Sequence, residues 1–305
     1  MTTEQDRANR RGDHIVHALL AGGTVRALAA VTTDTVAEAQ LRHGLYPVAA
    51  AALGRVLTVT ALLGVQLKPP QQVFVDVVGD GPLGYIKANA DAEGRVRGYV
   101  ANPHVHLPST PAGKLDVGRA VGKGYLYVTR DFGLKEPYRG YVPLVSGEIG
   151  EDFAYYFLRS EQLPSLVAVG VLVETDNTVR AAGGLIVQLL PGADDKVAEH
   201  LEKVAARLPA VSTSVDRGVS AEGLIRMAAG GLDVQVLEER AVRFACRCSR
   251  SRFEQALIAL GKDELEDMLR EDGEAELVCH FCSAKYHFSR EQLEALAAEA
   301  ARQGD

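Results

Sequence analysis

The chain has 305 residues, of which 47% are apolar and 24% charged, and 33 Lys and Arg against 40 Asp and Glu give a net charge of −7. This composition is typical of a globular protein of two domains rather than one, and the acidic balance argues against general nucleic-acid binding, which needs a basic excess. Four cysteines are too few for a secreted fold stapled by disulfides, and all four lie beyond residue 245.

The first part of the chain carries charged residues and no signal-peptide pattern, so we expect a cytoplasmic protein. Its longest apolar stretch, residues 48–67, is interrupted by Arg55, Thr58, Thr60 and Gln66. A central arginine is costly in lipid. The stretch therefore predicts a buried, alanine-rich core helix over about 46–67, and we expect no membrane partner.

The elements around this helix are mainly strands. A strand is predicted at 25–32, and others at 73–78, 85–89, 95–100 and 125–130, where β-branched residues alternate between turn residues. A helix is predicted over about 148–160, at whose start Glu148, Glu151 and Asp152 suit the helix dipole better than a catalytic pair. Strands at 166–175 and 179–190 form a hairpin. Successive hairpins predict an α+β core domain over residues 1–190, with antiparallel pairing and packed helices.

Residues 191–240 have a pattern typical of helices. Apolar residues recur at steps of three and four over 194–208, namely Val197, Leu201, Val204 and Leu208. A second short helix is predicted from the N-cap Ser220 to about residue 229. This apolar surface is too small for a core of its own. We therefore expect a metastable helical linker that depends on a neighbouring domain.

The last segment, residues 241–305, holds two cysteine pairs. Cys246 and Cys248 form a C-x-C pair, Cys279 and Cys282 form a C-x-x-C pair, and 30 residues separate the two. Each spacing lets two sulfurs converge on one ion, and four thiolates suit tetrahedral Zn²⁺. The flanking residues predict a hairpin around the second pair and a C-terminal helix, with Ser289 and Gln292 as a capping box.

Two histidines, His280 and His287, are alternative ligands in this segment, but four cysteines already complete a structural site. Residues 241–305 are therefore predicted to be a small zinc-binding domain, with one Zn²⁺ on Cys246, Cys248, Cys279 and Cys282.

The same spacings suit a redox switch. A C-x-x-C pair closes readily into a disulfide, whereas a C-x-C pair closes only into a small, strained ring. Thiolates react with peroxide or hypochlorite. Metal binding contributes about 10–16 kcal/mol to the folding of small zinc domains, against a typical domain stability of about 5–15 kcal/mol. Oxidation of one pair would therefore expel zinc, unfold the domain and expose the neighbouring apolar stripe to other unfolded chains.

At this point the residues resemble a known family, the redox-regulated 33-kilodalton chaperonins, which are bacterial heat-shock holdases. One motif is the C-x-C and C-x-x-C combination at this separation. The second is the core segment made of residues 138–144, 146–157 and 160–162, which looks like the signature helix region of the family. The resemblance covers essentially the whole chain.

The resemblance implies a cytoplasmic holdase, not an enzyme, that is inactive when reduced and zinc-bound. It implies that oxidation pairs Cys279 with Cys282 and releases zinc. Linker unfolding and a Cys246–Cys248 disulfide would follow, giving an active homodimer that holds unfolded client proteins. The client surface of the family maps here to residues 191–240.

Two other classes stay open from the residues. A basic block beside the C-x-C pair fits a zinc-ribbon nucleic-acid-binding module; its members are Arg240, Arg243, Arg247, Arg250 and Arg252. The acidic segment 262–276 would repel phosphate, so we expect no nucleic-acid partner. The C-x-x-C pair also fits a thiol–disulfide oxidoreductase, although the βαβ setting of that class is missing.

Overall fold

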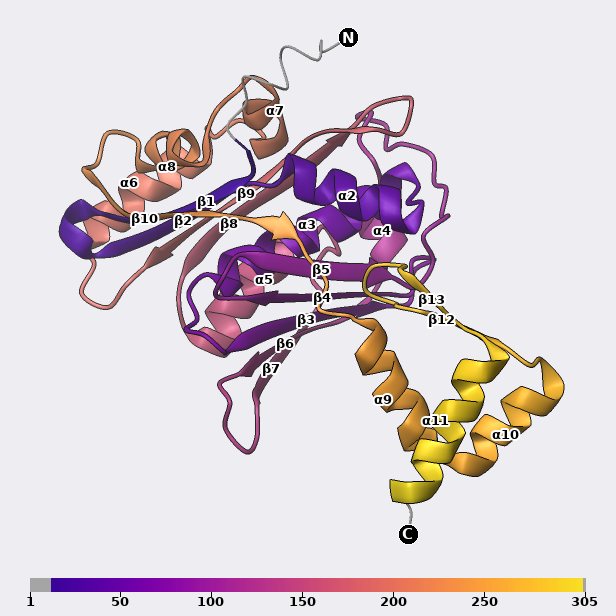
Figure 1. Cartoon of the computed structure of the whole chain (residues 1–305). Helices are drawn as coiled ribbons and strands as arrows, with labels where there is room; N and C mark the ends of the chain where they lie inside the picture. The colour runs from indigo at the N-terminus through magenta and orange to yellow at the C-terminus, as the bar shows by residue number, and fades with distance from the viewer. Residues whose placement is uncertain (1–11, 304–305) are drawn as a thin grey trace. The chain divides into compact units, whose positions relative to one another are not determined.

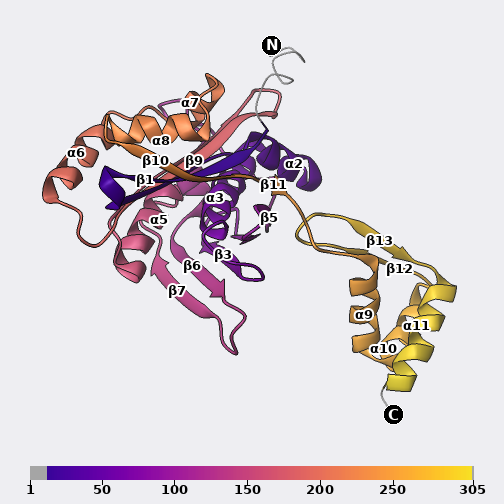
Figure 2. The ribbon, with the colours of Figure 1, turned by 60° about the vertical axis from the view of Figure 1, so that its left-hand side comes forward.

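The computed structural model describes residues 12–303, which form two compact units that divide between Ala245 and Cys246. The first unit is built on two sheets and the second on a small hairpin with three helices (Figures 1 and 2). Strand pairing is antiparallel except between β11 and β5, which run parallel. The predicted α+β class, with antiparallel sheets and packed helices, is confirmed.

The first sheet has five strands in the order β10-β1-β2-β9-β8. Their bounds are β1 (His14–Leu20), β2 (Val25–Val31), β8 (Ser165–Val173), β9 (Val179–Leu189) and β10 (Val234–Ala241). The predicted strand at 25–32 and the predicted hairpin at 166–190 correspond to β2, β8 and β9. β1 and β10 pair with each other although more than 200 residues separate them in the sequence. No local sequence pattern predicts this pairing.

The second sheet has six strands in the order β11-β5-β4-β3-β6-β7. Their bounds are β3 (Gln72–Gly79), β4 (Tyr85–Asp91), β5 (Arg95–Val100), β6 (Gly124–Asp131), β7 (Tyr138–Pro143) and β11 (Arg243–Phe244). The four strands predicted in this region are β3 to β6. β7 contains Gly140 and ends at Pro143, residues that weaken a strand prediction but are tolerated at the edge of a sheet.

The helix α3 (Pro47–Gly64) packs against strands of both sheets and forms the centre of the core. Every residue of α3 except Pro47 and Arg55 is buried. Within residues 12–303 it is the helix long and apolar enough to cross a membrane by length and composition, and 89% of it is buried inside the protein. The core-helix interpretation is confirmed. The shorter helices of this part are α2 (Thr33–His43), α4 (Val117–Val121) and α5 (Gly150–Tyr156), which a π-helical turn (Phe157–Glu161) extends.

Residues 191–240 belong to the first unit by their contacts. They form α6 (Asp195–Ala205), α7 (Val211–Asp216) and α8 (Ala221–Ala229), which lie over one face of the five-stranded sheet (Figures 1 and 2). Leu224 and Ile225 of α8 are buried there together with Val16 of β1. The helical linker expected over residues 191–240 ends in a strand that was not predicted, because residues 234–240 belong to β10. Pairing with β1 decides the conformation there, and the local sequence does not.

The second unit consists of α9 (Arg250–Leu260), α10 (Lys262–Glu271), β12 (Ala275–Val278), β13 (Lys285–Phe288) and α11 (Arg290–Gln303). Its apolar cluster is small; the buried members are Leu257, Leu265, Phe288, Leu293, Leu296, Ala297 and Ala300. The predicted hairpin and C-terminal helix are confirmed. Half of the capping box is present, since the backbone N–H of Ser289 donates to Oε1 of Gln292 at 3.0 Å. A core of this size supplies little stability by itself.

Candidate metal centre

The four cysteines come together in the second unit from two segments. Cys246 and Cys248 precede α9, and Cys279 and Cys282 lie in the turn between β12 and β13. Their four Sγ atoms all lie within 4.8 Å of one another. Cys248 lies 3.4 Å from Cys282 and Cys246 lies 3.7 Å from Cys279, sulfur to sulfur. No disulfide joins any two of these four cysteines.

The turn that carries Cys279 and Cys282 is fixed by backbone hydrogen bonds. The N–H of Cys279 donates to the carbonyl of Ala284 at 2.9 Å, and the N–H of Ser283 donates to the carbonyl of Cys279 at 2.7 Å. Ser283 has a φ of +56°, a left-handed conformation that glycine adopts more easily. The turn therefore directs two sulfurs to the same side of the hairpin before any ion binds.

The donor set fits a tetrahedral zinc ion. Zn–S bonds of about 2.3 Å place the sulfurs of a regular tetrahedron about 3.8 Å apart, close to the separations seen here. Burial raises the pKa of the Cys279 and Cys282 thiols. A divalent cation supplies the positive charge that keeps such buried groups as thiolates. Four soft sulfur donors suit Zn²⁺ rather than Mg²⁺ or Ca²⁺, which prefer oxygen.

The two histidines considered as ligands do not join this group. His280 is exposed. Nε2 of His287 lies 3.0 Å from Oε2 of Glu274. Among the described residues, the cluster therefore consists of four sulfur ligands and no histidine.

A tyrosine that the sequence reasoning missed also contacts the site. The hydroxyl of Tyr286 donates to Sγ of Cys248 at 3.2 Å, and its ring packs on Phe253 with centroids 4.7 Å apart. The hydrogen bond to Cys248, followed by burial, raises the pKa of Tyr286 to about 12. The phenol thus stays protonated at neutral pH and remains a donor. No spacing rule points to this residue, because its contact depends on strand register and on the packing of α9.

The acidic residues at the start of α5 have structural partners. The carboxylate of Asp152 accepts four backbone N–H groups at 2.8–3.2 Å; the donors are Val145, Ser146, Gly147 and Ile149. Glu148 accepts from Arg55 at 2.5 Å and from the N–H of Gly118 at 2.9 Å, while Glu151 is exposed. Glu151 and Asp152 lie in the first turn of α5, as the helix-dipole interpretation predicts, whereas Glu148 precedes the helix and binds Arg55 and Gly118.

The arginines of the basic block are divided between the two units. Arg240, in β10, pairs with Glu238. In the second unit Arg250 pairs with Glu254 at 3.2 Å, lies over the ring of Phe288 and donates to the carbonyl of His287 at 2.9 Å. Nη1 of Arg252 donates to the carbonyl of Arg247 at 3.1 Å. Much of this block is thus engaged inside the fold.

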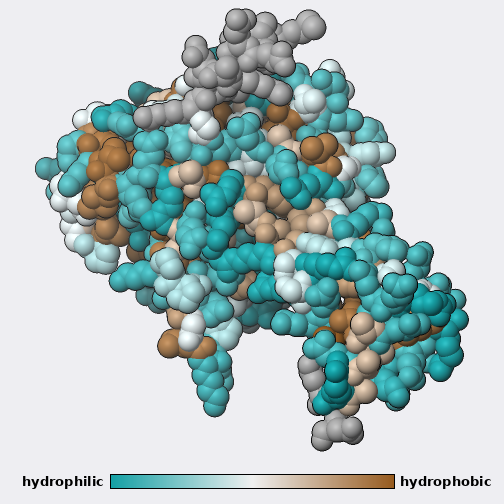
Figure 3. Space-filling view, viewed as in Figure 1, coloured by the Kyte–Doolittle hydropathy of each residue, from teal (hydrophilic) through white to brown (hydrophobic). Residues whose placement is uncertain are grey.

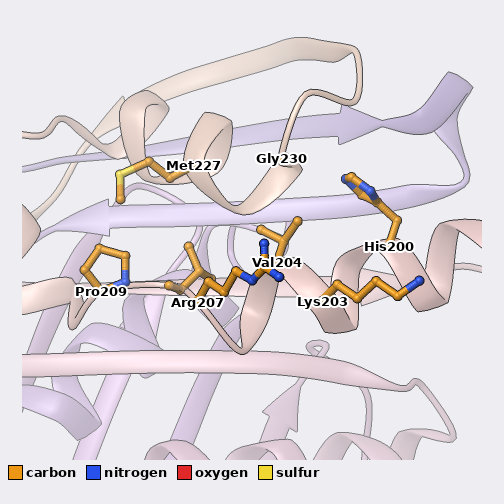
Figure 4. Close-up of a pocket in the computed structure, with 8 residues that line it drawn as sticks. His200, Lys203, Val204, Arg207, Pro209, Met227 and Gly230 are labelled. Atoms are coloured by element: carbon orange, nitrogen blue, oxygen red, sulfur yellow. The ribbon is translucent and has the colours of Figure 1, made fainter.

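A groove of about 560 Å³ lies between α6 and α8 in the first unit (Figure 4). Apolar side chains from both helices line it, among them Val204, Leu208 and Met227, together with His200, Lys203 and Arg207. Nε2 of His200 lies 3.1 Å from the carbonyl oxygen of Ala229. Brown, apolar surface gathers over α6 and α8 in Figure 3.

The helix α6 is poorly packed on its other side as well. A second cavity, of about 280 Å³, separates α6 from β8 and β9; its lining includes Leu166, Val187, Leu189, Leu201 and Ala205. No residue of α6 is buried. The apolar stripe predicted on this helix therefore rests on the sheet without being enclosed.

Comparison with known proteins gives one family over nearly the whole chain. The sequence profile described as "Hsp33 protein" matches residues 13–289. A 33 kDa chaperonin of Desulforamulus reducens is 52% identical over 92% of this chain and 96% of its own length, and one of Bacillus subtilis is 49% identical over 95% and 100%. The crystal structure of a 33 kDa chaperonin from Thermotoga maritima is similar with a TM-score of 0.90 and 38% identity, covering 96% of this chain and 100% of that one.

Proposed function

The chain belongs to the Hsp33 protein family and is a chaperone, and on that premise we propose that it is a redox-regulated holdase rather than an enzyme. In the reduced state Cys246, Cys248, Cys279 and Cys282 hold one Zn²⁺ and the chaperone is inactive. After oxidation the protein, as a cytoplasmic homodimer, binds unfolding clients and prevents their aggregation. The observation that supports this most is the four-sulfur cluster in a unit with a very small apolar core.

The chemical step converts two thiolates of one pair into a disulfide. With peroxide as oxidant, two thiolates and two protons react with H₂O₂ to give one S–S bond and two water molecules, and the sulfurs lose two electrons. A disulfide sulfur is a poor metal ligand, so each such step removes two ligands. The bound ion supplies charge neutralisation that holds the two cysteine segments together, and its loss removes that constraint.

We propose the pairs Cys279–Cys282 and Cys246–Cys248. Support comes from the family resemblance and from connectivity, because a disulfide within each pair leaves the hairpin and the C-x-C segment free to separate. Sulfurs of different pairs also lie close together, at 3.4 and 3.7 Å, so proximity alone does not select this pairing.

We propose that residues 191–240 are the metastable linker between a core of residues 1–190 and a switch domain of residues 241–305, and that they carry the client surface. The lack of any buried residue in α6, and the cavities on both of its sides, support this assignment. Release of α6 would expose its stripe and the apolar lining of the sheet cavity. Such surfaces bind unfolded chains.

A paired assay on the purified protein tests the proposal. Reduced and peroxide-treated samples are compared for zinc release, with a chromogenic chelator, and for suppression of a thermally aggregating client, by light scattering. We expect oxidation to release zinc and suppress aggregation. The variant Cys279→Ser/Cys282→Ser separates metal loss from disulfide formation. If oxidation releases zinc and client aggregation is unchanged, the holdase proposal is wrong.

A further inference from the structure

Three of the four sulfurs, those of Cys248, Cys279 and Cys282, receive hydrogen bonds of two kinds. Cys279 accepts from the backbone of Phe281, and Cys282 accepts from the backbone of Ala284. These donors are backbone N–H groups of the turn, so a side-chain substitution does not remove them. Cys248 instead accepts from a side chain, the hydroxyl of Tyr286 at 3.2 Å. Its donor is therefore a feature that a single substitution can remove.

Two contacts hold the Tyr286 hydroxyl in place. The residue faces Leu277 in the β12–β13 ladder, which fixes its backbone. Its ring packs on Phe253, in the first turn of α9 and five residues after Cys248. Tyr286 thus joins the hairpin that carries one cysteine pair to the segment that carries the other. It is the single tyrosine between residues 246 and 305.

We propose that Tyr286 is a positioning residue that slows the oxidation of Cys248 in the reduced protein, an inference that rests on the proposed function. Oxidation of Cys248 itself begins when its thiolate attacks one oxygen of peroxide. An S–O bond forms, the O–O bond breaks, hydroxide leaves and the sulfur, as sulfenic acid, has lost two electrons. The hydrogen bond from Tyr286 engages a sulfur lone pair and withdraws electron density from it, which reduces its nucleophilicity.

The size of the effect follows from the strength of one hydrogen bond. Loss of the phenol should raise the oxidation rate of Cys248 by roughly three- to tenfold, the rate equivalent of one such bond. Cys279 and Cys282 keep their backbone donors, so their rates should change by less than about twofold. The result is a selective loss of protection at the C-x-C pair, not a general loosening of the site.

The test uses the full-length, zinc-loaded protein with Tyr286→Phe. Samples taken during peroxide treatment are alkylated, and peptide mass spectrometry gives a rate for each cysteine. Lys285→Gln is the matched control, because it changes an exposed neighbour in the same strand and keeps both the Tyr286 hydroxyl and the Phe253 contact. We expect faster oxidation of Cys248 in Tyr286→Phe and a near wild-type rate in Lys285→Gln. An unchanged Cys248 rate, or equal acceleration of all four cysteines in both variants, overturns the proposal.

A spectroscopic measurement separates the hydrogen bond from folding. With Co²⁺ as the probe, Tyr286→Phe should keep the tetrahedral d–d bands and shift the sulfur-to-cobalt charge-transfer band, while Lys285→Gln leaves that band in place. Failure of Tyr286→Phe to bind Co²⁺ would contradict the proposal, which assigns Tyr286 no role in holding the ion. Client aggregation is followed with oxidised wild-type protein in parallel. If the wild type holds clients and the Cys248 rate is unaffected by the substitution, only the role of Tyr286 fails.

Discussion

Two helices of the first unit, α3 and α6, differ sharply in how far their side chains are buried. All of α3 except Pro47 and Arg55 is buried between the two sheets, whereas no residue of α6 is buried and a cavity lies on each side of it. Local opening follows the number of enclosed apolar contacts. The comparison therefore locates the stable scaffold in the sheets and α3, and the element most easily released in α6.

The second unit extends this comparison. Its apolar cluster is formed by a few side chains around Phe288, and its four cysteines come from a short hairpin and from the segment before α9. A unit of about 60 residues with such a core usually needs a metal or disulfides to fold. Metal occupancy should therefore control the folding of residues 246–303 and leave α3 unaffected.

Loss of a metal ligand is expected to have the largest effect. Cys279→Ser should abolish most of the metal-dependent folding free energy of the second unit, which is about 10–16 kcal/mol in zinc peptides. Hydrogen exchange should show loss of protection in α9 to α11 and retained protection in α3. His280→Ala is the control, and it should keep both the metal and the protection. Protected α9 to α11 amides in metal-free Cys279→Ser would contradict this dependence.

Truncation of matched leucines should separate α3 from α6. Leu57 of α3 is fully buried, and Leu57→Ala should lower the free energy of unfolding by about 2–5 kcal/mol. Leu201 of α6 is only partly buried, so Leu201→Ala should cost about 1 kcal/mol or less. Denaturant unfolding of the reduced, zinc-loaded proteins measures both. Equal losses would remove the distinction between the helices.

The free energy of unfolding is expected to depend on pH through Asp13. Asp13 accepts from the N–H groups of Asp34 and Thr35 at the start of α2, and burial raises its pKa from 3.8 to about 6. The folded state then binds a proton that the unfolded state has already lost. Stability from this group is present below about pH 4 and is lost as pH rises to about 6, by at most about 3 kcal/mol.

The variant Asp13→Asn tests this pH dependence. The difference in free energy of unfolding between wild type and variant should change between pH 4 and 6 and be constant above pH 7. Because zinc loss at low pH affects both proteins, it cancels in the difference. Parallel curves over the whole range would show that Asp13 does not titrate as described.

The smallest effect is expected at the cysteine turn. Ser283 has a φ of +56°, which costs a residue with a side chain roughly 1 kcal/mol relative to glycine. Ser283→Gly should therefore stabilise the zinc-bound second unit by about 0.5–1 kcal/mol, seen as a higher chelator concentration needed for zinc removal. Ala284→Gly, at the next position, should give no gain. If both variants, or neither, resist zinc removal better than the wild type, the positive φ of Ser283 does not limit the stability of the turn.

Local patterns were enough to predict the parts of the fold that are set by one segment. The apolar run of α3, the stripe of α6 and the alternation of β3 to β6 are each visible within a few turns or strands. The metal cluster was predicted for a similar reason, since C-x-C and C-x-x-C place sulfurs together almost regardless of context. The helices α9 and α10 were not predicted, because the sequence of this part was interpreted only as a basic block over 240–252 and an acidic segment over 262–276.

What could not be predicted depends on partners distant in the sequence. β10 is a strand because β1 lies beside it, and β7 is tolerated with Gly140 and Pro143 because it is an edge strand. The Tyr286–Cys248 hydrogen bond needs the register of β13 and the position of α9 together. The cavities on both sides of α6 likewise follow from how the helix rests on the sheet, which its own periodicity does not reveal.

The central claim is that oxidation at the cysteines releases α6 and leaves the α3 core intact. Hydrogen exchange with mass spectrometry, on the full-length protein before and after peroxide treatment, measures this directly. We predict that, with the zinc released, the amides of α6 and of residues 250–303 exchange much faster, and that those of α3 keep their wild-type protection. Continued protection of α6 after complete zinc release, or loss of protection in α3 to the same extent, would contradict the account.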